Sequence, residues 1–300
     1  MPLSFELVLC YYDNPDALRR WLHRHLDCTD LRPLLESSWG HLTIADTGTP
    51  TDRFQQSVNL CGGFVPGLVR YIHADTEAIR RRTPPDIHCR PTAHAMNLAT
   101  DYSDRDLVIY SVLGSIPPPD WFRKVVAFHE QHPRSLLQAQ QFSLTSATYH
   151  TEDYRLPMKE ALLKGEVRQT TGMPDWSVRR EFLLECGGWD ESMVTWGMCD
   201  VDLCSRLTGK IDTGENAHEW LNLGTGDGDM PPYRNFGLEF HRPPPPEWYS
   251  VVCQGYPGAQ PYDDSREKAS AITFSQYLGQ WGIVGRNYGR VPIKHQVFTP

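Results

Sequence analysis

The sequence predicts an α/β domain with a mostly parallel central sheet flanked by helices. The first indication is a strand, turn and helix in succession, from the apolar run at residues 4–12 through Asn14-Pro15-Asp16 to apolar positions at helical spacing over residues 17–22. The second is the run at residues 106–111, which is apolar on both faces as buried parallel strands are. The third is length, because 300 residues with 40% hydrophobic content can enclose one large core.

The remaining elements continue this alternation. Further strands are predicted at residues 41–46, 65–73 and 135–144, and further helices at residues 92–100, 177–184 and 201–207. Prolines at positions 117–119 interrupt the sheet and begin another helix near Trp121, since Pro suits the first turn of a helix. Beyond residue 224 the chain is rich in Gly, Pro and aromatic residues, which predicts loops that close over a site.

Composition excludes several classes of protein. A net charge of −8 argues against a nucleic-acid-binding surface, and the one basic run, Arg80-Arg81-Arg82, is too short to change this. The eight cysteines form no Cys-x-x-Cys pair, so neither a metal cluster nor a disulfide scaffold is expected. The chain enters its first strand without a basic leader, and no apolar run approaches the roughly 20 residues that span a bilayer. We therefore expect a cytoplasmic protein with reduced thiols and no transmembrane segment.

The most informative segment combines a Gly-Gly turn, a Trp-Gly pair and several acids. Residues 185–191 read Glu-Cys-Gly-Gly-Trp-Asp-Glu, and residues 196–207 read Trp-Gly-Met-Cys-Asp-Val-Asp-Leu-Cys-Ser-Arg-Leu. The glycines allow a sharp turn, Trp196 offers an apolar face to a sugar ring, and Asp200 opens a helix where an acidic group is favoured. In the alternative interpretation the tryptophans and leucines are core residues and the acids are surface charges. Leu203 and Leu207 share one helical face and fit the core under either interpretation.

This segment resembles the acceptor-side motif of GT-A fold glycosyltransferases, family 2-like enzymes with a galactosyltransferase-type motif, which reads GGFDE followed by GWGxEDxDLxxRL. The resemblance implies that Asp200 is the catalytic base. Cys199 stands where the family has the Glu of Glu-Asp, so recognition of sugar hydroxyls is expected to differ. The other residues implied to contact the sugar or the acceptor are Asp190, Glu191, Trp196, Gly197 and Asp202.

The N-terminal half resembles the same family in the same order. Residues 7–15 stand where the family has a strand ending in a T-Y-N-R-P-like turn, and residues 44–49 stand where it has V-D-D-G-S. Ligands bind beyond the carboxyl ends of strands in such sheets. The residues implied to bind the nucleotide are Tyr12, Asp13, Asp46, Asn97 and Ser111. In the alternative interpretation of Asp46, it is an ordinary turn residue. His94 lies in the segment that resembles the family's R-N-L-G helix, and in its alternative interpretation it is a residue of the helix surface.

The metal-binding Asp-x-Asp of the family is missing. Its positions fall on Val112-Leu113-Gly114, and neither Val112 nor Gly114 has the side-chain oxygen that a hard divalent cation prefers. In one alternative the leaving diphosphate is held by Arg80, Arg81, Arg82 and Arg90, whose guanidinium groups match phosphate bidentately. In another, Mg²⁺ or Mn²⁺ is held weakly by Asp200 and His241, because residues 239–244 resemble the family's H-x-W-H-P segment, although His241 also suits a loop histidine that bonds to local backbone. In a third, catalysis has been lost and the protein is a carbohydrate-binding or interaction module.

These patterns favour a glycosyltransferase with atypical or absent metal dependence that moves a sugar from a UDP- or GDP-linked donor to a glycan or other hydroxyl acceptor. A base at Asp200 deprotonates the attacking hydroxyl, and inversion follows if the displacement is direct. Another type of sugar-nucleotide enzyme is a further alternative. We expect a GT-A-like domain over residues 1–246, with a nucleotide half at 1–115 and an acceptor half at 116–246, and a C-terminal extension over 247–300 that packs on it.

Overall fold

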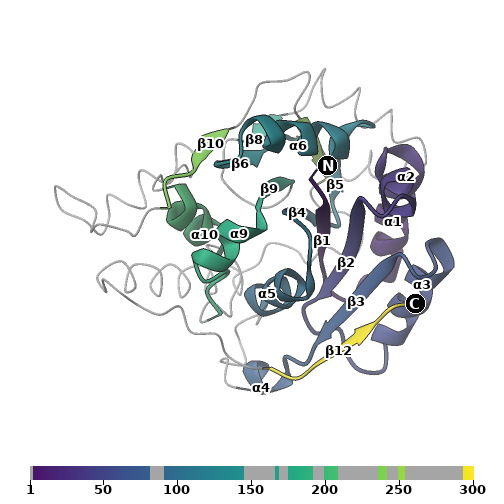
Figure 1. Ribbon diagram of the computed structural model, residues 1–300. Coiled ribbons are helices and arrows are strands. Elements are labelled where there is room, and N and C mark those ends of the chain that lie inside the picture. Colours follow the sequence, from purple (N-terminus) through teal and green to yellow (C-terminus); the bar gives the residue numbers. More distant parts are fainter. Residues whose placement is uncertain are drawn as a thin grey trace.

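The computed structural model describes residues 3–81, 91–144, 166–168, 175–191, 199–208, 236–241, 249–253 and 293–300. These residues form a large central sheet with helices on both faces and a smaller sheet beside it (Figure 1). Within this part of the chain, no helix is long and apolar enough to cross a membrane.

The central sheet has eight strands among the described residues, in the order β10-β6-β9-β4-β1-β2-β3-β12. In chain order they are β1 (Phe5–Tyr11), β2 (Gly40–Asp46), β3 (Val69–Ala74), β4 (Leu107–Val112), β6 (Ser135–Gln138), β9 (Trp176–Arg179), β10 (Glu239–His241) and β12 (His295–Phe298). Only β9 and β12 run against the other six. Because β1 pairs with β2 and β4, Tyr11 lies opposite Asp46 and Cys10 lies opposite Val112, so the carboxyl ends of these strands meet at one edge.

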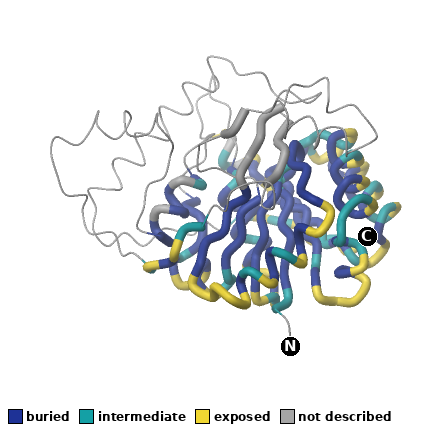
Figure 2. The backbone as a smooth tube through the Cα atoms, turned by 90° about the horizontal axis from the view of Figure 1, so that it is seen from above, coloured by how far each residue is buried: buried dark blue, intermediate teal, exposed yellow. Residues whose placement is uncertain are grey.

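Each face of the sheet is covered by its own helices. The first face carries α1 (Pro15–Cys28), α2 (Leu31–Glu36), α3 (Phe54–Phe64) and α6 (Trp121–Gln131). The second carries α5 (Thr92–Tyr102), α9 (Arg180–Glu185) and α10 (Cys199–Thr208). Alternate residues of β1 supply both cores, with Leu7 and Leu9 on the first face and Val8 on the second. Figure 2 shows the resulting buried strands through the centre, with exposed residues at the loop tips.

The first helix begins as its sequence predicts. Asn14 Oδ1 accepts a hydrogen bond of 3.0 Å from the Ala17 amide, and Pro15 occupies the first turn. The predicted strands at residues 4–12, 41–46, 65–73 and 106–111 are confirmed as β1 to β4, and the predicted helices at 92–100 and 201–207 as α5 and α10. The helices α2, α3 and α4 (Glu77–Arg80) were not predicted.

Two predicted elements are wrong. The single strand expected at residues 135–144 is interrupted at Ala139, and its second part is β7 (Gln140–Leu144), which belongs to the smaller sheet. The helix expected at 177–184 starts only at Arg180, because the preceding residues form β9 between β4 and β6. There Trp176 and Val178 point into the second core while Ser177 bonds to His129 in α6, which is the two-residue period of a strand.

The smaller sheet contains β5 (Ser115–Ile116), β11 (Tyr249–Cys253), β7 and β8 (Glu166–Arg168), in the order β5-β11-β7-β8. The last residues of the chain return to the central sheet, where β12 pairs antiparallel with β3 at its edge (Figure 1). Strands β11 and β12 both come from the predicted C-terminal extension. Most of the loops predicted beyond residue 224 lie outside the described residues.

Candidate functional site

The loop after β2 is organised around the carboxylate of Asp46, which is completely buried. Its Oδ1 accepts from the Gly48 amide at 3.1 Å and from the Thr49 amide and hydroxyl at 2.9 and 2.8 Å. Its Oδ2 accepts from the Tyr71 hydroxyl at 2.8 Å and lies 2.8 Å from His73 Nδ1. Burial, and next the charge of Asp46, raise the pKa of Tyr71 far above its usual value, so this hydroxyl stays a donor. Asp46 thus shapes the loop, and its contact with a nucleotide stays a prediction.

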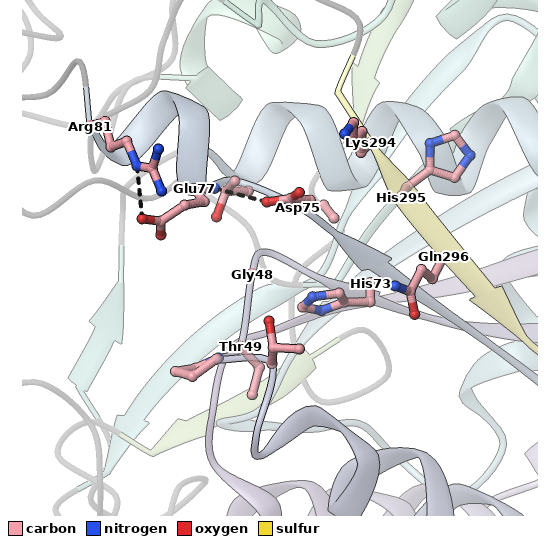
Figure 3. Close-up of a pocket in the computed structure, with 13 residues that line it drawn as sticks. Gly48, Thr49, His73, Asp75, Glu77, Arg81, Lys294, His295 and Gln296 are labelled. Atoms are coloured by element: carbon pink, nitrogen blue, oxygen red, sulfur yellow. Dashed lines mark hydrogen bonds and ion pairs between the residues drawn. The ribbon is translucent and has the colours of Figure 1, made fainter.

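A cavity of about 880 Å³, with a mixed polar and apolar lining, lies beyond the carboxyl ends of β2 and β3 (Figure 3). Its walls come from residues 48–51, residues 73–77, Arg81, and residues 294–296 of the returning C-terminal segment. His73 is fixed at this wall by a stack on Phe54, with ring centroids 4.4 Å apart. The volume falls within the range of small-molecule sites, roughly 300–1,000 Å³.

Gly48 is essential to the shape of this cavity. Its φ of +103° disfavours any side chain, and a Cβ added there would lie 2.0 Å from Thr76 Oγ1. The close approach of Gly48 to Thr76 therefore brings the loops after β2 and β3 together at the cavity wall.

The loop after β1 is fastened to the same wall. Tyr12 and Asp13, both predicted to bind the nucleotide, are half-buried at the end of β1. The Asp13 amide donates to Thr49 Oγ1 at 2.9 Å, and the Asp13 carboxylate lies 2.7 Å from Arg53. Asp13 also adopts a left-handed φ of 37°, which turns the chain sharply after the strand. The structure therefore brings Tyr12, Asp13 and Asp46 to one edge.

Asn97, also predicted to contact the nucleotide, is completely buried and joins α5 to the motif turn. Its amide nitrogen donates to the Trp189 carbonyl and to Glu191 Oε1, both at 2.8 Å, and its Oδ1 accepts from the Trp189 amide at 2.8 Å. Asn97 therefore positions the turn, and its contact with a nucleotide stays a prediction. His94 is buried as well, 3.9 Å from Glu191 Oε2, which corrects the alternative that it lies on the helix surface.

The motif turn has the sharp geometry that its glycines predict, since φ is +85° at Gly187 and +74° at Gly188. The acids that follow it are not open to solvent, because Asp190 is 2% exposed and Glu191 is 5% exposed. Both acids lie inside the domain in this structure, and their contact with the sugar or the acceptor stays a prediction.

Asp202 is another buried acid of the motif, and it is paired within α10. Its Oδ2 lies 2.6 Å from Arg206 Nη2, and Arg206 Nη1 donates to the Cys186 carbonyl at 3.0 Å. Burial raises the pKa of Asp202, with Arg206 opposing the shift and Asp190 adding to it. Asp202 therefore anchors α10 to the motif turn through Arg206, and its contact with the acceptor stays a prediction.

Asp200 differs from these acids because it is half-buried in the first turn of α10. Burial raises the pKa of the adjacent Cys199 thiol well above its usual value, and the nearby Asp200 and Cys10 add to that shift. Cys10 lies on β1 opposite Val112, so the start of α10 lies near the carboxyl ends of β1 and β4. A carboxylate there is favoured by the helix dipole.

The missing Asp-x-Asp is a feature of the structure as well as the sequence. Val112 is half-buried, Leu113 and Gly114 are buried, and the described residues contain no group of three or more His, Cys, Asp or Glu side chains that could hold a metal ion. The residues present at this position therefore do not fit a divalent cation.

His241 lies on the sheet face opposite α10. Its ring contacts Phe128 and His132 at the end of α6, with centroids 5.2 Å away in both cases, and its Nε2 lies 3.1 Å from Glu239. The neighbouring Phe240 points to the α10 face instead. This arrangement argues against a cation shared by Asp200 and His241.

The predicted phosphate-binding arginines are only partly described. Arg81 lines the cavity, is 76% exposed at its side chain and pairs with Glu77 at 3.1 Å (Figure 3). Arg80 ends α4, but its side chain lies outside the described part of the chain. Arg82 and Arg90, like the predicted sugar contacts Trp196 and Gly197, lie outside the described residues altogether.

Sequence reasoning missed a carboxylate, Asp175, which lies immediately before β9 and bonds to Tyr110 of β4 through its backbone amide. It is 2% exposed, and its oxygens accept hydrogen bonds from Ser111, a predicted nucleotide contact, and from Ser115. The available signal was Pro174-Asp175 immediately before an apolar and aromatic segment, since such a pair marks a turn.

Solved glycosyltransferase structures are similar to this chain. The structure of GalNAc-T7 with UDP, GalNAc and Mn²⁺ matches with a TM-score of 0.52 at 12% identity, covering 96% of this chain and 52% of that chain. S. aureus TarS matches with a TM-score of 0.45 at 9% identity, covering 67% of this chain and 32% of that chain. The structure of TarS residues 1–349 in complex with UDP matches with a TM-score of 0.43 at 11% identity, covering 68% of this chain and 54% of that chain.

The likeness to GalNAc-T7, together with the mostly parallel central sheet, shows that this chain has a GT-A glycosyltransferase fold. The chain spans only about half of GalNAc-T7, at 52% of its length. No protein-family model and no curated protein matches the sequence.

Proposed function

We propose that this protein is a glycosyltransferase that binds a nucleotide-sugar donor at the carboxyl edge of its central sheet and transfers the sugar to a hydroxyl acceptor. The observation that carries this proposal is the position of Asp200. It is half-buried, whereas Asp190, Glu191 and Asp202 of the same motif are buried, and it opens a helix near the ends of β1 and β4. The GT-A fold supports the proposal, and the GalNAc-T7 structure of that fold holds UDP and GalNAc.

The donor nucleoside occupies the cavity at the ends of β2 and β3. That cavity is large enough for a nucleoside, is lined by hydroxyl, imidazole and charged groups, and is joined to the β1 loop through Asp13 and Thr49. The buried Asp46 network fixes the shape of this wall before a ligand arrives. A UDP-linked donor is favoured over a GDP-linked one because GalNAc-T7 binds UDP.

The chemical step is a direct displacement. The acceptor hydroxyl gives its proton to the Asp200 carboxylate as its oxygen bonds to the anomeric carbon, and the bond from that carbon to the phosphate oxygen breaks. The electron pair leaves with the nucleoside diphosphate, and the configuration inverts. A general base of this kind typically contributes 10²–10⁴-fold to the rate.

The leaving diphosphate develops charge that needs positive partners. Val112 and Gly114 offer no ligand to a cation, so this step is assigned to the arginines between α4 and α5. Arg81 is the one of this group whose side chain is described, and it lines the cavity. The proposal is therefore a transferase that works without a metal at the Asp-x-Asp position.

Asp200→Asn tests the assignment of the base. The change keeps size and removes basicity, so release of UDP from UDP-sugars should fall by at least roughly 10²-fold, while UDP binding measured by calorimetry stays unchanged. Asp104→Asn is the matched control, because that carboxylate is 84% exposed and pairs only weakly with the adjacent Arg105 at 3.3 Å. Turnover in Asp200→Asn equal to that of the control would exclude Asp200 as the base.

The second candidate function is a binding module without catalysis, favoured by the loss of both metal-binding carboxylates. It predicts UDP or glycan binding without release of UDP from any nucleotide sugar in a panel of UDP- and GDP-linked donors. The same panel therefore separates the two candidates.

A further inference from the structure

Asp175 has an unusual backbone for a residue with a side chain. Its φ of +61° lies in the left-handed region, which residues other than Gly adopt uncommonly. Such conformations persist where the surrounding structure imposes them, and they concentrate at functional sites. Here the residue is also 2% exposed, so its conformation is imposed from inside the domain.

The carboxylate of Asp175 holds both ends of one turn. Ser111, in the last part of β4, donates to Oδ1 at 3.3 Å, and Ser115, the first residue of β5, donates to Oδ2. Between the two serines lie residues 112–114, the position at which the GT-A resemblance expects the metal-binding acids. Ser111 in turn accepts from Trp21 Nε1 at 3.3 Å, which ties the turn to α1.

The main chain of Asp175 joins the two sheets at the same point. Its amide donates to the Tyr110 carbonyl of β4 at 2.9 Å, and its carbonyl accepts from the Ala139 amide, between β6 and β7, at 3.1 Å. Both β5 and β7 pair with β11 in the smaller sheet. Asp175 therefore contacts the central sheet and the start of the smaller one through separate groups.

We propose that Asp175 is a positioning residue of the donor site, whose buried carboxylate fixes the turn at residues 112–114 in place of a bound cation. The turn is then already ordered when the donor binds, and it lies beside the donor diphosphate. The assignment of a ligand to this surface rests on the proposed function, whereas the fixing of the turn rests on the contacts of Asp175 alone.

The test compares variants that separate backbone, charge and hydroxyl effects. Asp175→Gly keeps the left-handed conformation and removes the carboxylate, Asp175→Asn keeps its size and removes the charge, and Ser115→Ala removes one donor. The matched control is Ser177→Ala, another buried serine of the central sheet, which bonds to His129 at 2.9 Å on the face away from the motif. UDP affinity is measured by calorimetry well below the melting temperature of each variant.

We expect UDP to bind at least about tenfold more weakly to Asp175→Gly and Ser115→Ala, as for loss of a hydrogen bond to a charged group. Asp175→Asn should lie between these and the unchanged protein. Ser177→Ala should keep its UDP affinity even if its melting temperature falls. If Ser115→Ala and Asp175→Gly bind UDP as tightly as Ser177→Ala does, the positioning role is refuted.

Hydrogen exchange provides a readout that needs no ligand. Removal of the carboxylate should accelerate amide exchange over residues 112–116 at least about tenfold, with smaller changes at β2 and β3. Unchanged exchange there would overturn the fixing of the turn itself. If UDP does not bind to the unchanged protein, the proposed donor fails, and exchange alone decides whether Asp175 fixes the turn.

Discussion

Asp46 and Asp200 are two acids near the same edge of the sheet with opposite surroundings. Asp46 is completely buried and accepts five hydrogen bonds from described residues, so its carboxylate stabilises the conformation of the β2 loop. Asp200 is half-buried at the start of α10. The comparison separates an acid whose hydrogen bonds shape the site from an acid that is partly exposed at the start of a helix.

The acceptor motif also contains buried, hydrogen-bonded residues beside the half-buried Asp200. Asn97, Glu191, Asp202 and Arg206 bind one another or the backbone of the motif turn, and all four are buried. They hold the turn against α5 and α10, and thereby hold Asp200 near the edge. These four residues therefore form a frame around Asp200, whose role as the base is a proposal.

Arg206→Met should have the largest effect on this frame. It removes the partner of the buried Asp202, and breaking a buried pair in this way typically costs about 3–5 kcal/mol of unfolding free energy. Urea denaturation provides the measurement, and the double variant Asp202→Leu with Arg206→Met should recover much of the loss because no charge stays buried. A loss below about 1 kcal/mol in the single variant would mean that the pair is not part of the frame.

Two buried histidines under the first face make stability depend on pH. Burial lowers the pKa of both His25, in α1, and His129, in α6, to about 3. Each is neutral in the folded state and takes up a proton on unfolding below about pH 6.5, so unfolding free energy falls as pH drops from about 6.5 toward 3. By pH 5 the loss reaches about 2 kcal/mol for each histidine.

The measurement is urea denaturation between pH 7.5 and 5 for His25→Gln and His129→Gln. Each variant should remove about half of the histidine-dependent slope. Because His25 lies under the nucleotide half and His129 under the acceptor half, equal contributions indicate that the halves unfold together. An unaltered slope in either variant would show that its histidine is already charged in the folded protein.

Asp46→Asn should have a smaller effect, confined mainly to the nucleotide side. The amide replaces an acceptor with a donor that faces Tyr71 and His73, so the loop loosens and UDP affinity should fall about tenfold. Calorimetry with UDP gives the result, and Asp200→Asn is the internal comparison because its UDP affinity should not change. Equal affinities in both variants would remove the distinction between the two acids.

The sequence predicts the fold more completely than the site. Apolar runs such as residues 106–111 report burial directly, so the first four strands and α5 were predictable. The sequence predicts a helix over residues 177–184, whereas the first of these residues form a strand. The strand depends on pairing with β4 and β6, which are distant in the chain, and a local sequence pattern does not show such pairing. Likewise, the sequence does not reveal the buried partners of Asn97 and Asp202, and the hydrogen bonds of Asp175 come from serines 64 and 60 residues away along the chain.

The most direct measurement of the central claim is a calorimetric titration of the protein with UDP, first with Mn²⁺ and then with EDTA. If the donor binds at this edge without a metal at residues 112–114, UDP binds in both conditions with affinities within about threefold of each other, a difference below about 1 kcal/mol. Absence of UDP binding in both conditions would contradict a UDP-linked donor. Binding that EDTA abolishes would contradict the metal-free site and require a cation ligand outside the described residues.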